Sequence, residues 1–312
     1  MTGSNKYKVI ILGSGPSGLT AAIYTARANL NPLVIQGQLP GGQLTTTTEI
    51  ENFPGFEDGI FGAELMEKMT KQAQRFGAEL LMKYVTKVDF SKKPFKIYCE
   101  QEEFQADAVI ISTGATPRML GLDEEKSLLG FGLSTCATCD GAFFNNQEIV
   151  VVGGGDSACE EAIFLTRFGK RVRLIHRRDE LRASKIMADR VKANPKIEII
   201  WNSGITKLLS DKTNSLYGAI IKNLKTNEET TIECAAVFYA IGHKPNTDLF
   251  HDILELDENG YLITEPEGTK TNVAGIFACG DVQDHKYRQA ITAAGSGCMA
   301  AIECARYLEE NE

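Results

Sequence analysis

Residues 9–18 read VIILGSGPSG, and residues 149–158 read IVVVGGGDSA. Each stretch is a short apolar strand that runs into a glycine turn and then into a segment with apolar residues at helical spacing. In such a motif the first glycine permits a tight turn, the second lets the backbone approach a pyrophosphate, and the third small residue lets the helix pack on the strand. One such turn is a weak signal, but two in matching context predict two nucleotide-binding motifs.

The spacing of apolar residues predicts which face of three helices is buried. The expected inward residues are Leu19, Ala22, Ile23 and Ala26 after the first turn, Ala158, Ala162 and Leu165 after the second, and Ile291, Gly295, Cys298, Ile302 and Ala305 in a C-terminal helix. An apolar strand before that last helix ends at Gly280 and Asp281. These two residues are typical of a turn, but after two nucleotide motifs we favour a carboxylate that accepts hydrogen bonds from a polyol chain.

The residue that ends the second strand of each motif indicates which nucleotide binds there, because it lies beside the adenosine ribose. The first motif has Gln36 at this position, and the second has His176 at the same offset from its first glycine. Two arginines follow His176, and arginine suits a 2′-phosphate, so we predict an NADP site in the second motif. Its expected residues are Gly153, Gly154, Gly155, Asp156, Ser157, His176, Arg177, Arg178 and Arg182.

A solvated charge cluster is the alternative to this NADP site, with Asp179 and Glu180 partly neutralising the arginines. In the first motif, Gln36 replaces the acidic residue that usually binds a free ribose 2′-hydroxyl. The glutamine amide can still hydrogen-bond that hydroxyl. A cofactor without a 2′-phosphate, such as FAD, therefore fits the first motif.

Two further apolar strands, 108–112 and 237–241, end near the glycine turns at Gly114 and Gly242 and are expected to cross between domains. Because they flank the second motif, we expect the first domain to be discontinuous. The predicted fold class is α/β, with two Rossmann-like dinucleotide-binding domains. Residues 1–117 and 247–312 are expected to form the FAD-binding domain, and residues 118–246 the inserted NADPH-binding domain.

The composition is that of a globular protein of enzyme size. The 312 residues are 43% hydrophobic, which is enough to bury the cores of two domains. The formal net charge of -8 argues against a general electrostatic attraction to nucleic acid or to an anionic membrane. Residues 1–12 contain no long apolar stretch of the kind found in signal peptides, so we expect a cytoplasmic protein.

Eight cysteines occur, and in a cytoplasmic chain they are not expected to form a structural disulfide framework. Only Cys136 and Cys139 form a close C-x-x-C pair, and the alternative of a zinc site lacks a second pair or paired histidines, so no metal is expected. Free N–H groups at a helix start lower a thiol pKa, which favours a redox-active dithiol. Asp140 follows directly as the nearest proton carrier, although a helix-capping role fits it equally well.

In their order and spacing, these motifs resemble those of the low-molecular-weight thioredoxin reductases, flavoproteins of the pyridine-nucleotide disulfide oxidoreductase class. The matching residues are 13–18, 41–45, 51–55, 136–140, 153–158, 176–179 with 182–183, and 280–281 with 288–290. The resemblance implies a homodimer that reduces thioredoxin with electrons from NADPH through FAD. It implies FAD binding by Gly13, Ser14, Gly15, Pro16, Gly18, Gln36, Gly37, Gly41, Gly42, Gln43, Asn52, Gly280, Asp281, Arg288, Gln289 and Ala290.

The resemblance also implies unequal roles for the two cysteines. Cys139 is expected to face the flavin, Cys136 to attack the disulfide of thioredoxin, and Asp140 to donate a proton. Two other functions stay open on the residues alone, namely a flavin reductase with a different disulfide partner and a flavin-binding redox sensor. Sustained NADPH consumption with thioredoxin separates an enzyme from a sensor, because a sensor stops after one turnover.

The arginine pair leads to a first testable prediction. Replacing Arg177 and Arg178 together by alanine should weaken NADPH binding and narrow its preference over NADH by a few kcal/mol at most, because charge-assisted hydrogen bonds to the 2′-phosphate are lost. Steady-state kinetics with both cofactors measure this preference. An unchanged ratio of NADPH to NADH efficiency would contradict the assignment of these residues.

Overall fold

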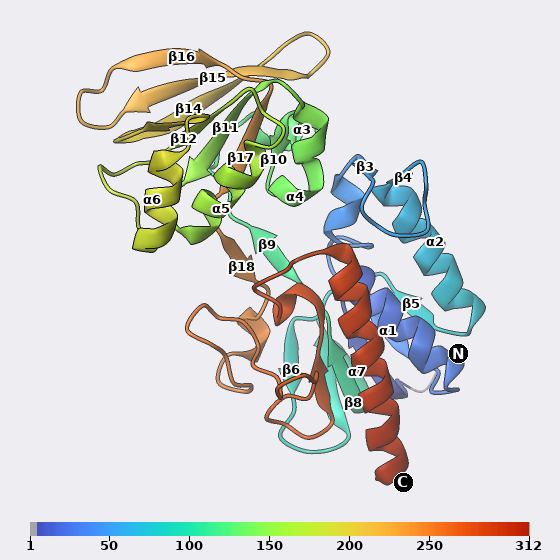
Figure 1. The fold of residues 1–312 in the computed structure, drawn as a ribbon. Coiled ribbons are helices and arrows are strands. Elements are labelled where there is room, and N and C mark those ends of the chain that lie inside the picture. The colour runs from blue at the N-terminus through green and yellow to red at the C-terminus, as the bar shows by residue number, and fades with distance from the viewer. Residues whose placement is uncertain (1–4, 312) are drawn as a thin grey trace. The chain divides into compact units, whose positions relative to one another are not determined.

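The structure is a computed structural model that describes residues 5–311. The chain folds into two compact units (Figure 1). The first unit combines Met1–Thr116 with Lys244–Glu312, and the second unit is Pro117–His243. Along the sequence, the second unit is therefore an insert in the first.

The first unit has a seven-stranded sheet. Its strands are β1 (Lys6–Leu12), β2 (Leu33–Ile35), β5 (Glu79–Leu81), β6 (Lys87–Asp89), β7 (Phe95–Cys99), β8 (Glu102–Ile111) and β19 (Ile276–Ala278). Parallel pairing joins β5, β2, β1, β8 and β19, while β6 and β7 extend the sheet as an antiparallel hairpin. The first half of β8 pairs with β7 and its second half with β19. β1 lies between β2 and β8, inside the parallel part of the sheet, and the first glycine turn follows it.

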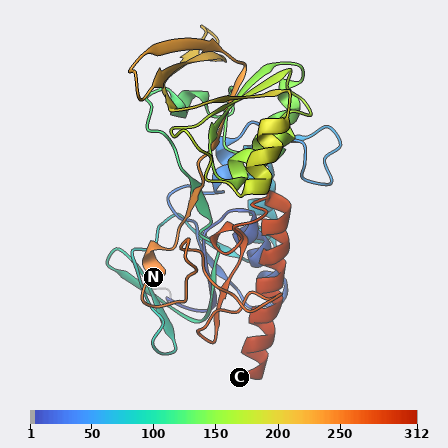
Figure 2. The same cartoon turned by 60° about the vertical axis from the view of Figure 1, so that its left-hand side comes forward.

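The longer helices of the first unit are α1 (Pro16–Arg27), α2 (Gly62–Arg75) and α7 (Ala290–Glu310). Shorter elements are β3 (Glu49–Ile50), β4 (Ile60–Phe61) and the 3₁₀ turns η1 (Gln43–Thr46), η3 (Asp248–Phe250) and η4 (Gly280–Val282). The predicted inward face of α1 is confirmed, because Leu19, Ala22, Ile23 and Ala26 are all buried. α7 runs beside α1 (Figure 1), and Figure 2 shows it as one unbroken helix at the side of the first unit.

The buried face of α7 differs from the prediction, which was wrong here. The buried residues are Ala293, Gly297, Ala300, Ala301, Cys304 and Leu308. The expected inward residues Ile291 and Ile302 are instead 43% and 40% exposed. A Cβ atom at Gly297 would lie 2.1 Å from the carbonyl oxygen of Ser17, so α7 approaches α1 too closely for large side chains. The larger residues are therefore turned outward.

The second unit contains a five-stranded parallel sheet in the order β10-β17-β11-β12-β13 and a three-stranded antiparallel sheet, β14-β15-β16. The parallel strands are β10 (Leu133–Ser134), β11 (Glu148–Gly153), β12 (Arg171–Ile175), β13 (Ile197–Ile200) and β17 (Ala236–Ala240). The antiparallel strands are β14 (Ser203–Ser210), β15 (Leu216–Asn223) and β16 (Glu229–Glu233). The helices are α3 (Glu125–Leu128), α4 (Ala137–Asp140), α5 (Asp156–Leu165), α6 (Lys185–Ala193) and the 3₁₀ turn η2 (Gly141–Phe144).

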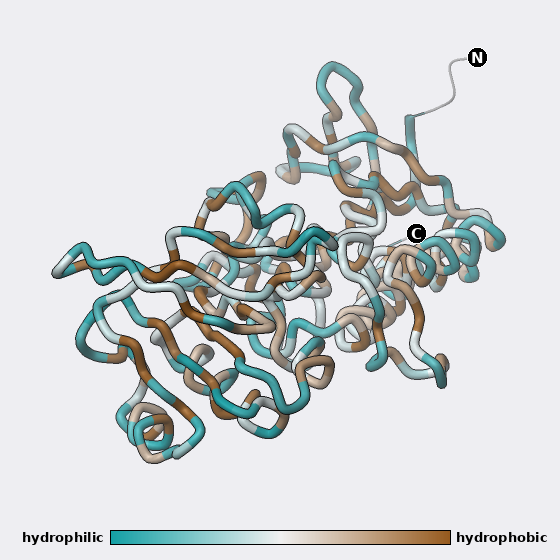
Figure 3. The backbone as a smooth tube through the Cα atoms, turned by 90° about the horizontal axis from the view of Figure 1, so that it is seen from above, coloured by the Kyte–Doolittle hydropathy of each residue, from teal (hydrophilic) through white to brown (hydrophobic). Residues whose placement is uncertain are grey.

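The core of the second unit explains why its central strands read as unbroken apolar runs. Both faces of β11 are covered, so the four residues 149–152 are all buried. The predicted inward residues Ala158, Ala162 and Leu165 of α5 are confirmed, since none of them is exposed to solvent. Hydrophobic colour follows many of the strands in Figure 3, and hydrophilic colour follows many of the loops between them.

The chain passes between the units along two short strands, β9 (Ala115–Pro117) and β18 (His243–Pro245), which pair with each other. Asn246 reinforces this pair, because its side chain donates to the Thr113 carbonyl and its backbone N–H donates to the Gly114 carbonyl at 2.8 and 2.9 Å. The predicted α/β class is confirmed: one sheet is mixed and the other is parallel, and in each a strand with parallel neighbours leads through a glycine turn into a helix.

Candidate active site and cofactor-binding residues

The first glycine turn, residues 13–18, is connected to the loop that follows β2. The Ser14 hydroxyl donates to the Gln36 carbonyl at 3.1 Å and accepts the Gly41 N–H at 3.0 Å. Gly42 lies against the turn, since a Cβ atom there would be 3.1 Å from the Cα of Gly15. The structure therefore brings together two stretches, 13–18 and 36–42, that were predicted to hold one cofactor.

The glycines of this turn are required for different reasons. A Cβ atom would lie 2.4 Å from the Ser112 carbonyl oxygen at Gly13, and 2.1 Å from the Gly13 carbonyl oxygen at Gly18. At Gly15, just before Pro16 starts α1, a Cβ atom would meet no protein atom within 4 Å. No neighbour among residues 5–311 requires glycine at that position, whereas a pyrophosphate that approaches the helix N-terminus would. The turn therefore fits a dinucleotide.

Other predicted cofactor residues of the first unit come from distant parts of the sequence. Asn52 Nδ2 donates to Gln289 Oε1 at 3.4 Å, and Gln43 Nε2 donates to the Ala115 carbonyl oxygen. Gly280 lies at the start of α1, because a Cβ atom there would be 2.5 Å from the Ser17 hydroxyl oxygen. The remaining predicted positions are Gly37, with a positive φ of 84°, Arg288, with a φ of 49°, and Ala290, the first residue of α7.

Asp281 is half-buried in the 3₁₀ turn between β19 and α7. Burial raises the pKa of its carboxyl to about 7, the neighbouring Asp284 adds to the increase, and Arg288 opposes it. A carboxylate whose charge is poorly solvated gains from hydroxyl donors, such as those of a polyol chain. The position and the raised pKa both fit the expected ligand role.

The second glycine turn, residues 153–158, repeats the geometry of the first. A Cβ atom at Gly153 would lie 2.5 Å from the Ala240 carbonyl oxygen, while one at Gly155 would meet no protein atom within 4 Å. Gly155 precedes α5, and Ser157 is exposed in its first turn. Asp156 is occupied within the protein, because its carboxylate accepts the backbone N–H and the hydroxyl of Ser184 at 2.9 and 2.8 Å.

The three arginines predicted to bind a 2′-phosphate, Arg177, Arg178 and Arg182, are exposed. Among residues 5–311, their guanidinium groups take part in no ion pair or hydrogen bond. Asp179 does not neutralise them, because its carboxylate pairs with Lys225 at 2.8 Å. His176 differs from the arginines in being buried, with 4% of its surface exposed. The arrangement favours an anion site over a self-neutralised charge cluster.

Cys136 and Cys139 are joined by a disulfide bond, with their Cα atoms 5.3 Å apart. Cys136 is the N-cap of the short helix α4, as the predicted helix start requires. The turn that carries the disulfide, residues 136–141, is anchored in the core of the second unit by two small residues. Ala137 is buried, and a Cβ atom at Gly141 would lie 2.9 Å from Cδ2 of Leu165 in α5.

Asp140 lies beside this disulfide and has a buried partner that the sequence analysis missed. The Ser134 hydroxyl donates to Asp140 Oδ2 at 2.6 Å and accepts the Cys136 N–H at 3.0 Å. Burial raises the pKa of the Asp140 carboxyl, and the hydrogen bond from Ser134 opposes part of that increase. A raised pKa favours a carboxyl that can hold and release a proton. Ser134 precedes Cys136 by two residues, but no sequence pattern indicated this contact.

The other six cysteines are free thiols, and all of them except Cys298 are buried. Burial raises the thiol pKa of Cys234 and of Cys279 to about 12, so thiolate chemistry is suppressed there. Within residues 5–311, no group of three or more His, Cys, Asp or Glu side chains could hold a metal ion. No helix in the same range is both long and apolar enough to span a bilayer.

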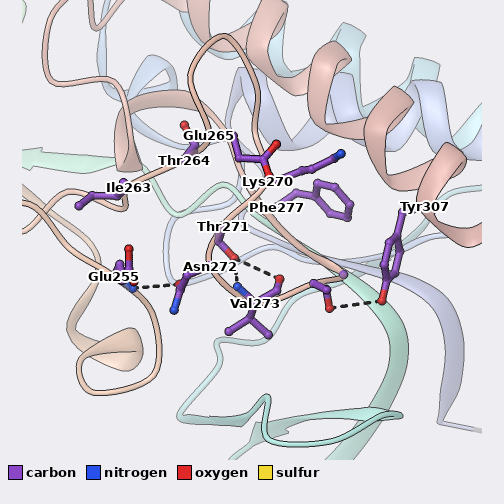
Figure 4. A pocket seen from close by; sticks show the side chains of 12 residues that line it. Glu255, Ile263, Thr264, Glu265, Lys270, Thr271, Asn272, Val273, Phe277 and Tyr307 are labelled. Atoms are coloured by element: carbon purple, nitrogen blue, oxygen red, sulfur yellow. Dashed lines mark hydrogen bonds between the residues drawn. The ribbon is translucent and has the colours of Figure 1, made fainter.

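A cavity of about 530 Å³ lies elsewhere in the first unit (Figure 4). It is lined by Glu255, residues 263–265, residues 270–275, Phe277 and Tyr307, and the Tyr307 hydroxyl donates to the Ala274 carbonyl. None of the predicted cofactor or catalytic residues lines this cavity. The cavity therefore lies outside the predicted site.

The sequence and the fold of this chain are similar to those of known proteins. Residues 7–297 match a family model described as "Pyridine nucleotide-disulphide oxidoreductase". A thioredoxin reductase of Rickettsia felis is 53% identical over 305 residues, which cover 97% of this chain and 98% of the relative. Thioredoxin reductase 2 of Arabidopsis thaliana is 51% identical, over 98% of this chain and 83% of the relative. The crystal structure of thioredoxin reductase from Streptococcus pyogenes aligns with a TM-score of 0.94 at 41% identity, over 99% of this chain and 100% of that one.

The chain therefore belongs to the pyridine nucleotide-disulphide oxidoreductase family. Within that family its relatives are the low-molecular-weight thioredoxin reductases, so the resemblance found in the sequence is confirmed. The chain is an oxidoreductase, and its C-x-x-C pair is close enough to form the disulfide that this chemistry needs.

The contact between Ser134 and Asp140 leads to a second prediction. Replacing Ser134 by alanine should raise the pKa of the Asp140 carboxyl further, because the hydrogen bond that favours the charged form is lost. ¹³C NMR of labelled aspartate side chains measures this pKa. The Ser134→Thr variant, which keeps the hydroxyl, is the matched control and should titrate like the wild type. Equal pKa values in all three proteins would contradict the assigned contact.

Proposed function

We propose that this chain is an NADPH-dependent flavoenzyme that reduces the disulfide of thioredoxin through FAD and the Cys136–Cys139 pair. The observation that carries the proposal is that one chain combines a C-x-x-C disulfide with two glycine turns that have free space at their second glycine, Gly15 or Gly155. The relatives named thioredoxin reductase support thioredoxin as the partner. A homodimer in the cytoplasm is part of the same proposal.

The proposed cofactor sites follow from the chemistry of the two units. The first unit would hold FAD at the turn of Gly13, the 36–43 loop, Asn52, Asp281 and the start of α7. The second would hold NADPH at the turn of Gly153 and at Arg177, Arg178 and Arg182. The exposed and unpaired guanidinium groups support a 2′-phosphate at that position. Gln36 offers an amide and no charge, which supports a nucleotide without that phosphate.

Each turnover would move two electrons from NADPH to the disulfide of thioredoxin, with the bound flavin as the carrier. Reduction of the Cys136–Cys139 bond leaves two thiols and consumes the electrons together with protons. Cys136 would then attack one sulfur of the partner disulfide, and Cys139 would release the mixed disulfide by attacking Cys136 Sγ. Asp140 would hold the proton that the leaving thiolate of the partner needs, which its buried position and raised pKa support.

Purified protein tests this function directly. We expect a flavin absorption spectrum, slow NADPH oxidation alone, and sustained NADPH oxidation when oxidised thioredoxin is added. A redox sensor would stop after one turnover, and a reductase with another partner would stay slow with thioredoxin. Either result would overturn the proposed activity.

The unequal roles of the cysteines lead to a third prediction. The Cys136→Ser variant should bind FAD and oxidise NADPH slowly, but fail to reduce thioredoxin, because the attacking thiolate is missing. Cys139→Ser is the matched variant, and it should trap thioredoxin as a mixed disulfide on Cys136, visible by mass spectrometry. Substantial thioredoxin reduction by Cys136→Ser would overturn the assigned roles.

The raised pKa of Asp281 leads to a fourth prediction. Without cofactor its pKa is about 7, whereas hydroxyl donors of a bound cofactor favour the ionised form, so FAD binding should release a proton. The affinity of flavin-free protein for FAD should then rise as the pH increases toward about 7, by at most roughly tenfold per pH unit, and level off above that pH. Calorimetric titration measures the affinity, and Asp281→Asn should show a flat profile. An identical slope in that variant would assign the pH dependence to another group.

A further inference from the structure

His176 is separated from the arginines with which the sequence groups it. The histidine is 4% exposed, while Arg177, Arg178 and Arg182 project from the exposed loop that follows. We call residues 177–182 the arginine loop. A ligand of the ribose phosphate has to reach solvent, and the buried imidazole does not.

The imidazole of His176 lies between the arginine loop and the second glycine turn. Its Nε2 donates to the Glu180 carbonyl oxygen at 2.9 Å, because a carbonyl can only accept. Its other side contacts the turn so closely that a Cβ atom at Gly154 would lie 2.2 Å from both Cε1 and Nδ1 of the ring. The side chain therefore connects two loops that were predicted to bind different parts of one dinucleotide.

Two further contacts join the same loops. The Arg182 N–H donates to the Gly154 carbonyl oxygen at 2.7 Å, and Asp156 accepts two hydrogen bonds from Ser184, just beyond the arginine loop. Leu181, within the arginine loop, is buried in the hydrophobic core of the second unit and anchors the loop there. The guanidinium groups are thus presented by a loop whose position depends on the glycine turn.

The contact with His176 explains a glycine that nucleotide binding does not require. Gly154 lies between the first and second glycines of the turn, where the dinucleotide fingerprint accepts any residue. Its φ is outside the positive range, so its backbone does not require glycine either. The remaining reason for glycine at residue 154 is the space that the His176 ring occupies.

The first unit has a corresponding contact between its glycine turn and the residue after its second strand, but there the side chain comes from the turn. Ser14 occupies the position of Gly154, and Gln36 the position of His176. There the side chain belongs to the turn, and Ser14 reaches the Gln36 carbonyl and the Gly41 N–H. Both units therefore fasten the glycine turn to the end of the second strand, once with a serine and once with a histidine.

We propose that His176 is a positioning residue of the pyridine nucleotide site, which fastens the glycine turn to the arginine loop, and that it is no ligand of the ribose 2′-phosphate. This inference rests on the proposed NADP site of the second unit. Burial lowers the pKa of His176, and the nearby Arg182 and Arg178 lower it further, while the hydrogen bond to the Glu180 carbonyl opposes the shift. A neutral, buried ring leaves the phosphate charge to the exposed arginines.

The inference separates two kinds of binding loss. The pyrophosphate and the adenosine are common to NADP⁺ and NAD⁺, whereas the 2′-phosphate belongs to NADP⁺ alone. Loss of a residue that positions both loops should lower the affinity for NADP⁺ and the affinity for NAD⁺ by a similar factor. Loss of a residue that binds the 2′-phosphate should lower the affinity for NADP⁺ and leave the affinity for NAD⁺ unchanged.

Calorimetric titration of the flavin-loaded, oxidised protein with NADP⁺ and with NAD⁺ tests this difference. We expect His176→Ala to weaken both by roughly tenfold, the effect of losing a buried hydrogen bond and its packing. Arg177→Ala, the matched control, should weaken NADP⁺ alone. His176→Gln, whose amide N–H can reach the Glu180 carbonyl, should recover much of the binding of both.

A double-mutant cycle tests the contact with Gly154 itself. Gly154→Ala forces a Cβ atom into the space of the ring, so it should weaken both dinucleotides in the wild type. In the His176→Ala background that space is vacant, and Gly154→Ala should then cost little more. The only tryptophan of the chain, Trp201, lies with its ring centroid 6.3 Å from that of His176 and reports the same contact. Its emission should change in the His176→Ala and Gly154→Ala variants but not in Arg177→Ala.

Three results would overturn the inference: selective loss of NADP⁺ in His176→Ala, no recovery in His176→Gln, or additive effects of the two substitutions. If His176→Ala does not fold, the Gln variant and Gly154→Ala carry the comparison. Failure of the proposed function looks different, because the wild type would then bind NADP⁺ no more tightly than NAD⁺ and Arg177→Ala would change nothing. In that case the double-mutant cycle of His176→Ala and Gly154→Ala, measured by Trp201 emission, still decides whether His176 contacts Gly154.

Discussion

The structure depends on a contact that excludes any side chain at two positions. At Gly13 and at Gly153, a Cβ atom would lie 2.4 and 2.5 Å from a carbonyl oxygen of the strand end beside it, contributed by Ser112 and Ala240. These contacts let the chain turn directly from β1 into α1 and from β11 into α5. The neighbouring strands β8 and β17 end beside these turns, and the chain continues from them to β9 and β18. In each unit, the glycine turn therefore lies against the end of the strand from which the chain leads to the other unit.

Much of this fold could be predicted because parallel strands that are covered on both faces appear in the sequence as unbroken apolar runs, as residues 149–152 do. The same reasoning failed for α7. Hydrophobicity favoured the face with Ile291 and Ile302, whereas packing against α1 selected the face with Gly297. Side-chain size at a close helix contact depends on the distance to the partner helix, and a single sequence does not contain that distance.

The candidate site shows the same division. The glycine turns, the arginines and the C-x-x-C pair could be predicted, because each is a short pattern whose spacing has a chemical reason. The hydrogen bond from Ser134 to Asp140 and the position of His176 against Gly154 could not, since both join residues through the fold. His176 was grouped with its neighbours Arg177 and Arg178, but the end of β12 turns the histidine into the core and leaves the arginines outside.

Helix α5 connects the two chemical parts of the second unit. Gly155 precedes its first residue, and Gly141, which follows Asp140, packs against its last residue, Leu165. A helix of ten residues is about 15 Å long, so the glycine turn and the disulfide turn are held at opposite ends of one packed element. In the proposed enzyme both the nicotinamide and the disulfide have to reach a flavin that the first unit holds. If both cannot reach the flavin at once, the second unit would have to move as a whole to present first one and then the other, because α5 holds them in the same unit.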